Sequence, residues 1–471
     1  MYYPDSPAGG GPVIAVIGGG ASGTLAVIHL LREAAGRPGP LRIVLIDRHD
    51  RHGRGQAYAT AHPAHLLNSP AGMMSAVAGD PGHFTRWARQ AGLPADGFLP
   101  RSTYGRYLSG LLAETERNAR PGVRVSHLGS EVVAIHRTGA GHPLRLHLAA
   151  DGRIDADLVV LATGNLPPAP PCPVSPLARY IPDPWEPRAL APAADGSLVV
   201  LAGTGLTMLD VAIALTSAHP RTTVCAVSRH ALLPRQHRWP PAVARPGVSW
   251  AAPAPVTPLR LTGLIREVRS RVARSPDDWQ DVVDALRPQV PSLWEQLTPA
   301  DRRLFLCHVA RYWEVHRHRV PPATGTRIAA LQAAGRLRVL PGRIAGVSGD
   351  REEVRVRIAG GAAGTEITGG WLVNCTGPGA DITASAVPLL RSLLSSGLAR
   401  PDPLRLGLDA DARGAVRDAA GQPAADIFTL GPLLRGRWYE TTAVPEIRDQ
   451  AARLAHSLYG TLTQAGRDSA A

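Results

Sequence analysis

A glycine-rich turn near the start of the chain has the spacing needed to hold a dinucleotide. The stretch GGGASG at residues 18–23 matches G-x-G-x-x-G, with an apolar strand pattern before it and an apolar helix pattern after it. Glycines permit a tight turn and a close approach of the backbone to pyrophosphate, and the helix N-terminus supplies partial positive charge. Asp47 ends the next predicted strand, where a carboxylate accepts hydrogen bonds from ribose hydroxyls. The turn is therefore predicted to bind FAD or NAD.

A second turn of the same kind, GTGLTM at residues 203–208, has Met208 in place of the third glycine. The third glycine only allows close packing of helix on strand, so we expect Met208 to preserve binding and to push the helix outward a little. The following strand ends at Ser228 and Arg229, without a carboxylate. A hydroxyl and a guanidinium suit a 2′-phosphate, so this site is predicted to prefer NADPH over NADH. The alternative is that both are ordinary loop residues.

Two later motifs favour FAD at the first turn. LATGN at 161–165 resembles the second fingerprint of FAD-dependent oxidoreductases, and DIFTLGPLLRG at 426–436 resembles their third. A helix predicted from about Val444 would point its N-terminus at the flavin pyrimidine ring, where its dipole stabilises negative charge on the reduced flavin.

Loops after the first unit, GQAYAT and LLNSPAGMMS, are expected to wrap the isoalloxazine. Asn68 is predicted to bond the flavin edge or a hydroperoxide, or else to cap a turn. Arg101 and Tyr104 would contact flavin phosphate or ring, or make structural contacts only. The predicted FAD contacts are Gly18, Gly20, Ala21, Ser22, Gly23, Asp47, Arg48, Gln56, Tyr58, Asn68, Arg101, Tyr104, Val132, Thr163, Gly164 and Gly431, and the predicted NADPH contacts are Gly203, Thr204, Gly205, Leu206, Thr207, Ser228 and Arg229.

Candidate reaction groups lie in RGRWYETTAVPE, residues 435–446, which should face the cofactor. Arg437 or Glu440 could bind a charged substrate, with an interdomain salt bridge as the alternative; with Asn68 they are the candidate catalytic residues. His316 and His318 alternate with arginines that would repel a cation, so no metal site is predicted there. An anion or substrate-carboxylate site, or plain surface, remains open for that stretch.

Composition narrows the function classes. The net charge is +13, but all 51 basic residues are arginine and they are scattered, which argues against nucleic-acid binding. Without lysine, the chain can form no Schiff base and has no P-loop lysine. The four cysteines lack the spacing of zinc or disulfide motifs. No apolar run reaches transmembrane length, and we expect a cytoplasmic protein with no membrane partner.

The order of the motifs predicts an α/β fold with two Rossmann-like dinucleotide-binding domains. GGGASG followed by LATGN is echoed by GTGLTM followed by NCTGP, so each half opens with a glycine turn and closes with a strand ending in Thr-Gly. Residues 165–193 are proline-rich and are predicted to connect the halves. A helical insertion is predicted at about 258–325.

With both turns in place, the chain resembles the two-dinucleotide-binding-domain flavoproteins, and more closely the single-component flavin monooxygenases, including N-hydroxylating ones. The motifs that carry the resemblance also include LLNSP, PRSTYGRYL, SRH and ETTAVPEIRDQA. The resemblance implies an FAD domain in two pieces, 1–190 and 370–471, around an NADPH domain at 191–369. It also implies that NADPH reduces the flavin and that O2 then forms a C4a-hydroperoxide, which oxygenates a nitrogen, a sulfur or a carbonyl.

Two subclasses fit poorly. The F-x-G-x-x-x-H-x-x-x-W motif of Baeyer–Villiger enzymes is missing at 175–187, where only Trp185 could match, and no redox cysteine pair exists for a disulfide reductase. The predicted function is an NADPH-dependent FAD monooxygenase acting on the amine of a small metabolite, with a homo-oligomer possible. The alternatives are a flavin reductase or dehydrogenase without productive O2 use, and a non-catalytic redox-sensing flavoprotein.

Overall fold

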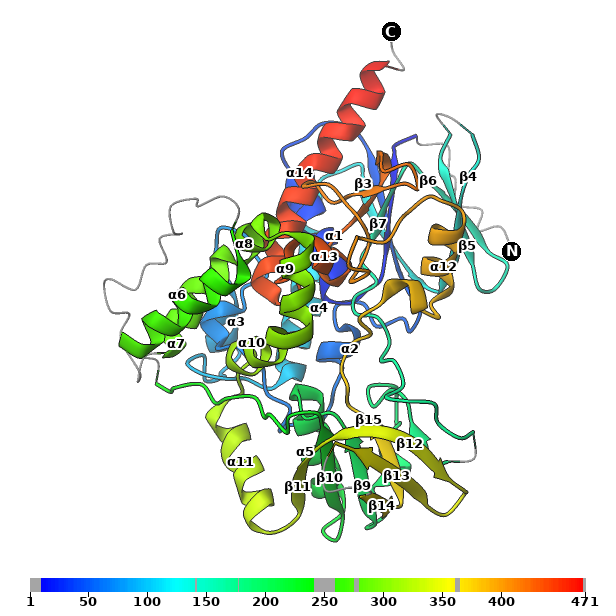
Figure 1. Ribbon diagram of the computed structural model, residues 1–471. Coiled ribbons are helices and arrows are strands. Elements are labelled where there is room, and N and C mark those ends of the chain that lie inside the picture. Colours follow the sequence, from blue (N-terminus) through cyan, green and yellow to red (C-terminus); the bar gives the residue numbers. More distant parts are fainter. Residues whose placement is uncertain are drawn as a thin grey trace.

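The computed structural model describes residues 10–139, 142–176, 178–240, 259–274, 279–360 and 365–468. These residues form two lobes, each built on a mostly parallel sheet, with a group of helices beside the upper lobe in Figure 1. The predicted α/β fold with two dinucleotide-binding units is confirmed. No helix of the described residues is long and apolar enough to cross a membrane.

The first glycine turn lies at the carboxyl end of a central strand in a six-stranded sheet. All neighbouring strands are parallel except β16 and β17, which form an antiparallel pair at one edge. The sheet order is β16 (Ala415–Arg417), β17 (Pro423–Thr429), β7 (Leu158–Leu161), β1 (Val13–Ile17), β2 (Leu41–Asp47) and β3 (Val123–Gly129).

Apolar helices cover one face of this sheet, and their buried side chains form one continuous core with the strands. The other face is covered by a small antiparallel sheet and a helix, which share a second core. The first group comprises α1 (Ala21–Ala34), α3 (His83–Gln90), α4 (Arg101–Arg117) and α14 (Val444–Asp468), with the short α2 (Gly55–Tyr58) beside α4; the second comprises β4 (Val132–Arg137), β5 (Leu144–Leu148), β6 (Arg153–Ala156) and α12 (Pro388–Ser395).

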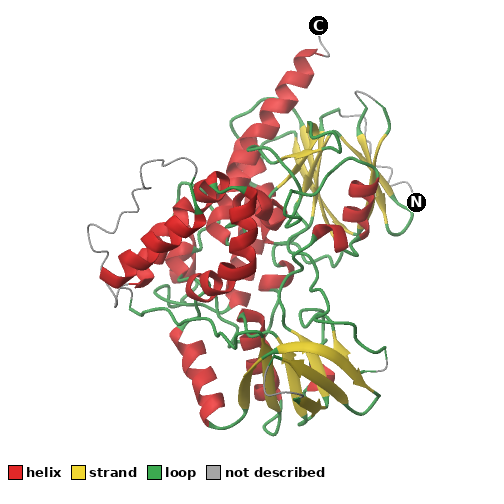
Figure 2. Cartoon of the chain, viewed as in Figure 1, coloured by secondary structure: helices red, strands yellow, loops and turns green. Residues whose placement is uncertain are grey.

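The second lobe carries a five-stranded parallel sheet. Two helices and a three-stranded antiparallel sheet pack around it, as the lower part of Figure 2 shows. Its order is β11 (Leu337–Pro341), β10 (Thr223–Ser228), β9 (Leu198–Ala202), β15 (Trp371–Asn374) and β8 (Tyr180–Ile181); the other elements are α5 (Leu206–Ala218), α11 (Pro322–Ala333), β12 (Arg343–Gly349), β13 (Val354–Ala359) and β14 (Glu366–Gly369).

This strand order extends the second unit beyond the predicted range 191–369 at both ends. β15 pairs with β9 residue by residue, and β8 pairs with β15, so both strands complete the second sheet rather than the first. The physical reason is that β9, the strand before the glycine turn, needs a parallel neighbour on each side. The predicted boundaries at 190 and 370 therefore cut through one sheet.

The helical insertion follows β10, close to the predicted 258–325. Its helices lie beside α14 and α13 (Arg435–Trp438) rather than on the second sheet (Figure 1). The indole Nε1 of Trp294 donates to the carbonyl of Gly436 at 2.9 Å, which fastens the insertion to the first unit. The helices are α6 (Leu261–Arg274), α7 (Trp279–Leu286), α8 (Val290–Gln296), α9 (Pro299–Leu304) and α10 (Ala310–Arg317).

Candidate functional site

The two glycine turns have the same backbone geometry. Gly18 has φ +110° and Gly203 has φ +111°, in the region that favours glycine. A Cβ on Gly18 would overlap the carbonyl oxygen of Ala162, and a Cβ on Gly203 would overlap that of Cys375. Each turn thus packs closely against the backbone that follows the last strand of its half, directly before the Thr-Gly pair.

Asp47, the last residue of β2, holds the first turn in shape. Asp47 Oδ2 accepts a hydrogen bond from the backbone N–H of Gly19 at 2.9 Å. Its Oδ1 accepts from the backbone N–H groups of His49 and Arg51. Burial alone would raise the pKa of Asp47, but these three backbone donors lower it below its ordinary value. The carboxylate is therefore charged and fixed at the strand end.

The third fingerprint meets the first turn directly. Gly431 has φ +73°, and a Cβ there would lie 2.7 Å from the Ser22 hydroxyl oxygen. The Gly431 N–H donates to Gln450 Oε1 at 2.8 Å, and the Thr441 hydroxyl donates to the Gly431 carbonyl at 2.9 Å. Residues far apart in the sequence are thus joined where α1 and α14 begin.

The first turn fits a dinucleotide pyrophosphate. A Cβ on Gly23 would overlap the Gly18 carbonyl oxygen, so helix and turn are as close as only glycine allows. The loop before α2 lies over the turn: the Gly53 N–H donates to the Gly19 carbonyl at 3.0 Å, and a Cβ on Gly55 would lie 2.6 Å from the Cα of Gly20. The glycines at 18, 20 and 23, with Ala21 and Ser22 after them, would hold the phosphates, and Asp47 the ribose.

Of the other predicted FAD contacts in this unit, two bind acidic side chains of the protein. Arg48 pairs with Glu186 at 3.3 Å, and the amide of Gln56 donates to Asp183 at 3.2 Å. Val132 lies in β4 and is buried among apolar side chains. Thr163 and Gly164 follow β7, where Gly164 has φ +75°.

The structure corrects the prediction that Tyr104 contacts the flavin. Its side chain is fully buried and packs against Tyr58, Phe84 and Tyr107, with ring centroids 4.7 to 5.5 Å apart. The tyrosine follows the apolar face of α4 into the core, so it cannot touch a ligand. Of this group, Tyr58 lies at the edge and reaches the cleft described below.

Arg101 joins the two units. Its guanidinium lies 2.7 Å from Asp210 Oδ2 on α5, its Nε donates to the Leu66 carbonyl at 3.1 Å, and it lies over the Trp185 ring. Asp210 is buried and Arg101 is mostly buried, with 8% and 11% of their side chains exposed. Burial raises the pKa of Asp210, and the guanidinium partly offsets this. Sequence patterns gave no sign of this pair.

The second turn opens beside Ser228. The Thr204 hydroxyl and the Ser228 hydroxyl lie 2.8 Å apart, which ties the turn to the end of β10. Met208 is fully buried in the core of this unit. The first hydrogen bond of α5, from Leu209 to Gly205, is 3.3 Å long, against 2.9 Å for its counterpart in α1. The outward displacement of α5 stays a prediction.

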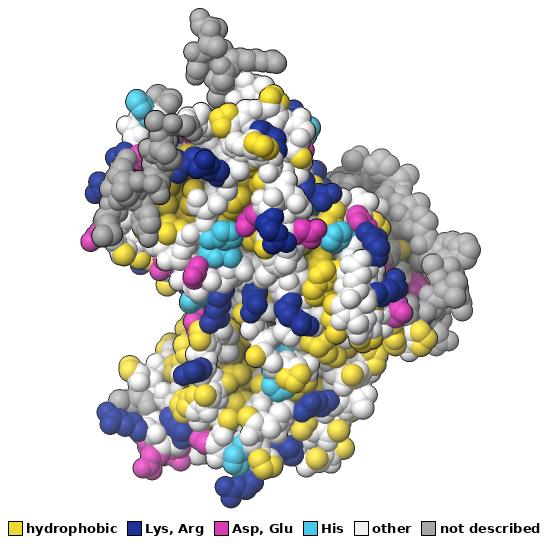
Figure 3. Space-filling model, turned by 180° about the vertical axis from the view of Figure 1, so that it is seen from behind, with side chains coloured by type: hydrophobic (Ala, Val, Ile, Leu, Met, Phe, Trp, Pro, Cys, Tyr) yellow, Lys and Arg dark blue, Asp and Glu magenta, His cyan; other side chains and the backbone are white. Residues whose placement is uncertain are grey.

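A cleft of about 1910 Å³ lies between the units and the helical insertion. Figure 3 shows the surface hollowed between the lobes, with arginines near the opening. Of the predicted contacts, the cleft is lined by Tyr58, Asn68, Arg101, Gly203, Thr204, Gly205, Leu206, Thr207, Ser228, Arg229 and Glu440.

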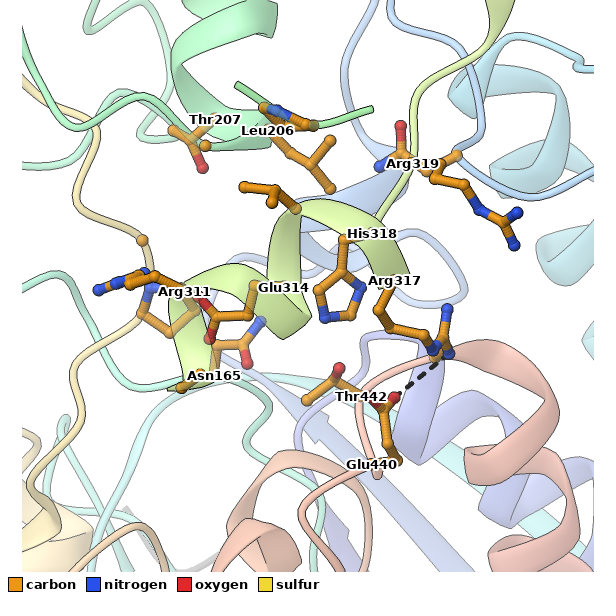
Figure 4. Close-up of a pocket in the computed structure, with 18 of the residues that line it drawn as sticks. Asn165, Leu206, Thr207, Arg311, Glu314, Arg317, His318, Arg319, Glu440 and Thr442 are labelled. Carbon is orange, nitrogen blue, oxygen red and sulfur yellow. Dashed lines mark hydrogen bonds and ion pairs between the residues drawn. The ribbon is translucent and has the colours of Figure 1, made fainter. Parts of the chain in front are cut away.

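A buried charge cluster forms one wall of the cleft. Glu440 accepts a hydrogen bond from Trp313 Nε1 at 2.9 Å and pairs with Arg317 at 3.2 Å (Figure 4). Burial would raise the pKa of Glu440, but the Arg317 charge lowers it below its ordinary value. Next to it, Arg287 binds both carboxylate oxygens of Glu446, at 2.7 and 2.8 Å. Glu440 is therefore a charged group in a site that also holds guanidinium groups.

The histidine-arginine stretch supplies part of this wall. His318 points into the cavity in Figure 4, and burial lowers its pKa. His316 instead contacts the Tyr312 carbonyl at 2.7 Å on the exposed side of α10. Among the residues that the structure describes, no cluster of three acidic, histidine or cysteine side chains could hold a metal.

Two predicted catalytic residues lie in the cleft and one does not. Asn68 lines the cleft, and its backbone carbonyl accepts a hydrogen bond from His237 Nε2 at 2.8 Å. The prediction for Arg437 is wrong, because its guanidinium pairs with Glu295 at 3.0 Å outside the cleft. This is the interdomain salt bridge that the sequence left as the alternative.

Comparisons with known proteins agree with this geometry. Residues 15–166 match the model of a family described as FAD-NAD(P)-binding. No curated protein matches. Three solved structures share a TM-score of 0.63: ornithine hydroxylase from Pseudomonas aeruginosa (15% identity, covering 96% of this chain and 99% of that one), L-lysine 6-monooxygenase from Pseudomonas syringae (16%, 95% and 99%), and a cadaverine monooxygenase bound to FAD from Erwinia amylovora (14%, 95% and 94%). Residues 15–166 are thus an FAD-NAD(P)-binding domain, and the whole chain has the fold of these monooxygenases.

Proposed function

We propose that the chain is an NADPH-dependent FAD monooxygenase that oxygenates a small metabolite at an amine nitrogen. The observation that carries the proposal is that the second glycine turn, the strand end at Ser228 and Arg229, and Glu440 all line one cleft. The first turn meets this region through Gly431 and the start of α14. Bound FAD, reduced by NADPH, would supply the oxygen-transfer chemistry.

The first unit and the cleft would have different roles. The first turn and Asp47 would hold FAD, and the start of α14 would stabilise negative charge on the flavin. The second turn would hold the NADPH pyrophosphate, with Ser228 and Arg229 at the 2′-phosphate. Glu440, which is paired with Arg317 at the wall of the cleft, would take part in binding a charged substrate. The solved structures of the same fold include an ornithine hydroxylase, an L-lysine 6-monooxygenase and a cadaverine monooxygenase.

The test is anaerobic reduction of the FAD-loaded protein by NADPH, followed by an oxygen pulse in the presence of candidate amines. We expect flavin bleaching with NADPH, then an oxygenated product formed in step with NADPH consumption. NADPH turnover that yields only hydrogen peroxide with every amine would overturn the monooxygenase assignment. Turnover with a quinone under nitrogen would identify a reductase or dehydrogenase instead, and FAD that NADPH fails to bleach would indicate a non-catalytic flavoprotein.

Nucleotide preference has its own test. Arg229→Ala should raise KM for NADPH much more than KM for NADH, because only NADPH carries the 2′-phosphate. Equal effects on the two cofactors would remove the 2′-phosphate assignment.

A further inference from the structure

A second arginine, Arg343, stands beside the same strand end as Arg229. Most arginines that line the cleft are paired with an acid: Arg287 with Glu446, Arg317 with Glu440, and Arg311 with Glu314. Within the described part of the chain, Arg229 and Arg343 have neither a hydrogen bond from the side chain nor an ion pair, and both are exposed on the cleft lining.

The backbone fixes Arg343 next to Ser228. β10 and β11 are parallel, with Ser228 opposite Pro341, so both strands end at the same edge. The Gly342 N–H then donates to the Ser228 carbonyl at 2.9 Å. Gly342 has φ +146°, and a Cβ there would overlap the side chain of Ile358, so the chain can turn here only with glycine. Arg343 is the next residue.

These two arginines at this edge of the sheet are both positively charged. Arg229 directly follows Ser228 at the end of β10, and Arg343 follows two residues after Pro341, the partner of Ser228 in the register at the end of β11. An exposed pair of like charges is favourable only when an anion or solvent lies between them. A dianionic phosphate accepts several N–H donors at once, and the planar guanidinium suits it.

We propose that Arg343 and Arg229 bind the 2′-phosphate of NADPH from two sides, and that Arg343 is a nucleotide-selectivity residue. The inference rests on the proposed NADPH site at the second glycine turn. It adds a contact that comes from β12, a strand of the small antiparallel sheet, and that no dinucleotide fingerprint contains.

Binding of adenosine 2′,5′-bisphosphate and of 5′-AMP to the full FAD-loaded chain tests this by calorimetry, without any substrate. The two probes differ by the 2′-phosphate alone. Arg343→Ala should weaken the bisphosphate by about tenfold or more, the worth of one charge-assisted contact, and should leave 5′-AMP nearly unchanged. Arg343→Lys should retain part of the preference, and added salt should reduce the difference between wild type and Arg343→Ala.

Arg338→Ala is the matched control, because Arg338 is an exposed arginine on β11 opposite Cys225 and lies outside the cleft lining. It should leave both affinities unchanged. Equal weakening of both probes by Arg343→Ala would mean an adenine contact and would overturn the inference. So would an unchanged bisphosphate affinity while Arg229→Ala abolishes it, with the NADPH site intact. A wild-type chain that binds neither probe preferentially would instead contradict the NADPH site itself.

Discussion

Breaking the buried ion pair between Arg101 and Asp210 should destabilise the junction of the two units. At 2.7 Å and an effective dielectric constant of about 20, the Coulomb attraction is ~6 kcal/mol, much of it offset by desolvation. Removal of one partner strands the other as a buried charge, which costs about 3–5 kcal/mol. We expect Arg101→Met to reduce the free energy of unfolding more than Asp210→Asn does, because Arg101 also donates a hydrogen bond to the Leu66 carbonyl.

Urea unfolding of both single variants and the double variant measures the coupling. The double variant should be more stable than the sum of the single losses predicts, by about 1–3 kcal/mol. The pH dependence has a defined sign. The pKa of Asp210 is raised in the folded protein, so the folded state holds this proton more tightly than the unfolded state does. Stability from this group therefore falls as the pH rises above the unfolded pKa.

In Arg101→Met the positive charge that lowers the pKa of Asp210 is gone, so the pKa of Asp210 in the folded protein rises further. The pH range over which stability depends on this group therefore extends to higher pH. That variant should regain stability relative to wild type as the pH is lowered from neutral toward the unfolded pKa of Asp210, and Arg101→Met with Asp210→Asn should not. Losses that add to within about 0.5 kcal/mol would refute the pairing. Measuring FAD retention distinguishes the ion-pair role of Arg101 from its predicted contact with FAD. Loss of FAD from Arg101→Met but not from Asp210→Asn would indicate that Arg101 contacts the cofactor directly.

Three further substitutions test individual features. Gly203→Ala should abolish NADPH binding and spare FAD retention, because its Cβ would overlap the Cys375 carbonyl; normal flavin reduction by NADPH would contradict this. Met208→Gly should cost about 3–5 kcal/mol in urea unfolding, from a core cavity and a helical glycine, with KM for NADPH little changed. Arg437→Ala should leave flavin reduction by NADPH unchanged, since its partner Glu295 lies outside the cleft; a tenfold slower rate in a folded variant would return it to the site.

The dinucleotide turns could be predicted because their physics is local. A glycine at positive φ, an apolar strand before it and a helix after it are all written in consecutive residues. The repeated motif predicted that each half opens with a glycine turn and closes with a strand that ends in Thr-Gly. The structure adds that Gly18 packs against Ala162, just after β7, and Gly203 against Cys375, just after β15. The contact of GQAYAT with the isoalloxazine stays a prediction; its first residue, Gly55, packs against Gly20 of the first turn.

What the sequence missed depends on long-range contacts. Arg101 is a residue type that often binds phosphate, and only the fold shows that its guanidinium forms an ion pair with Asp210. Tyr104 follows a loop of cofactor motifs, but the helical period turns it into the core. Arg343 is one arginine among many, and its place beside Ser228 depends on the register of two parallel strands.

α5 begins at Leu206, directly after the second glycine turn, and Asp210 lies one turn further on. Its carboxylate holds Arg101, and its carbonyl oxygen accepts a hydrogen bond from His65 Nε2 at 3.1 Å, both from the first unit. The helix end that would receive the dinucleotide is therefore also the point where the units are joined. Thermodynamic reciprocity follows: if dinucleotide binding and a ligand of the first unit both shift the equilibrium at this joint, each changes the affinity for the other by the same factor.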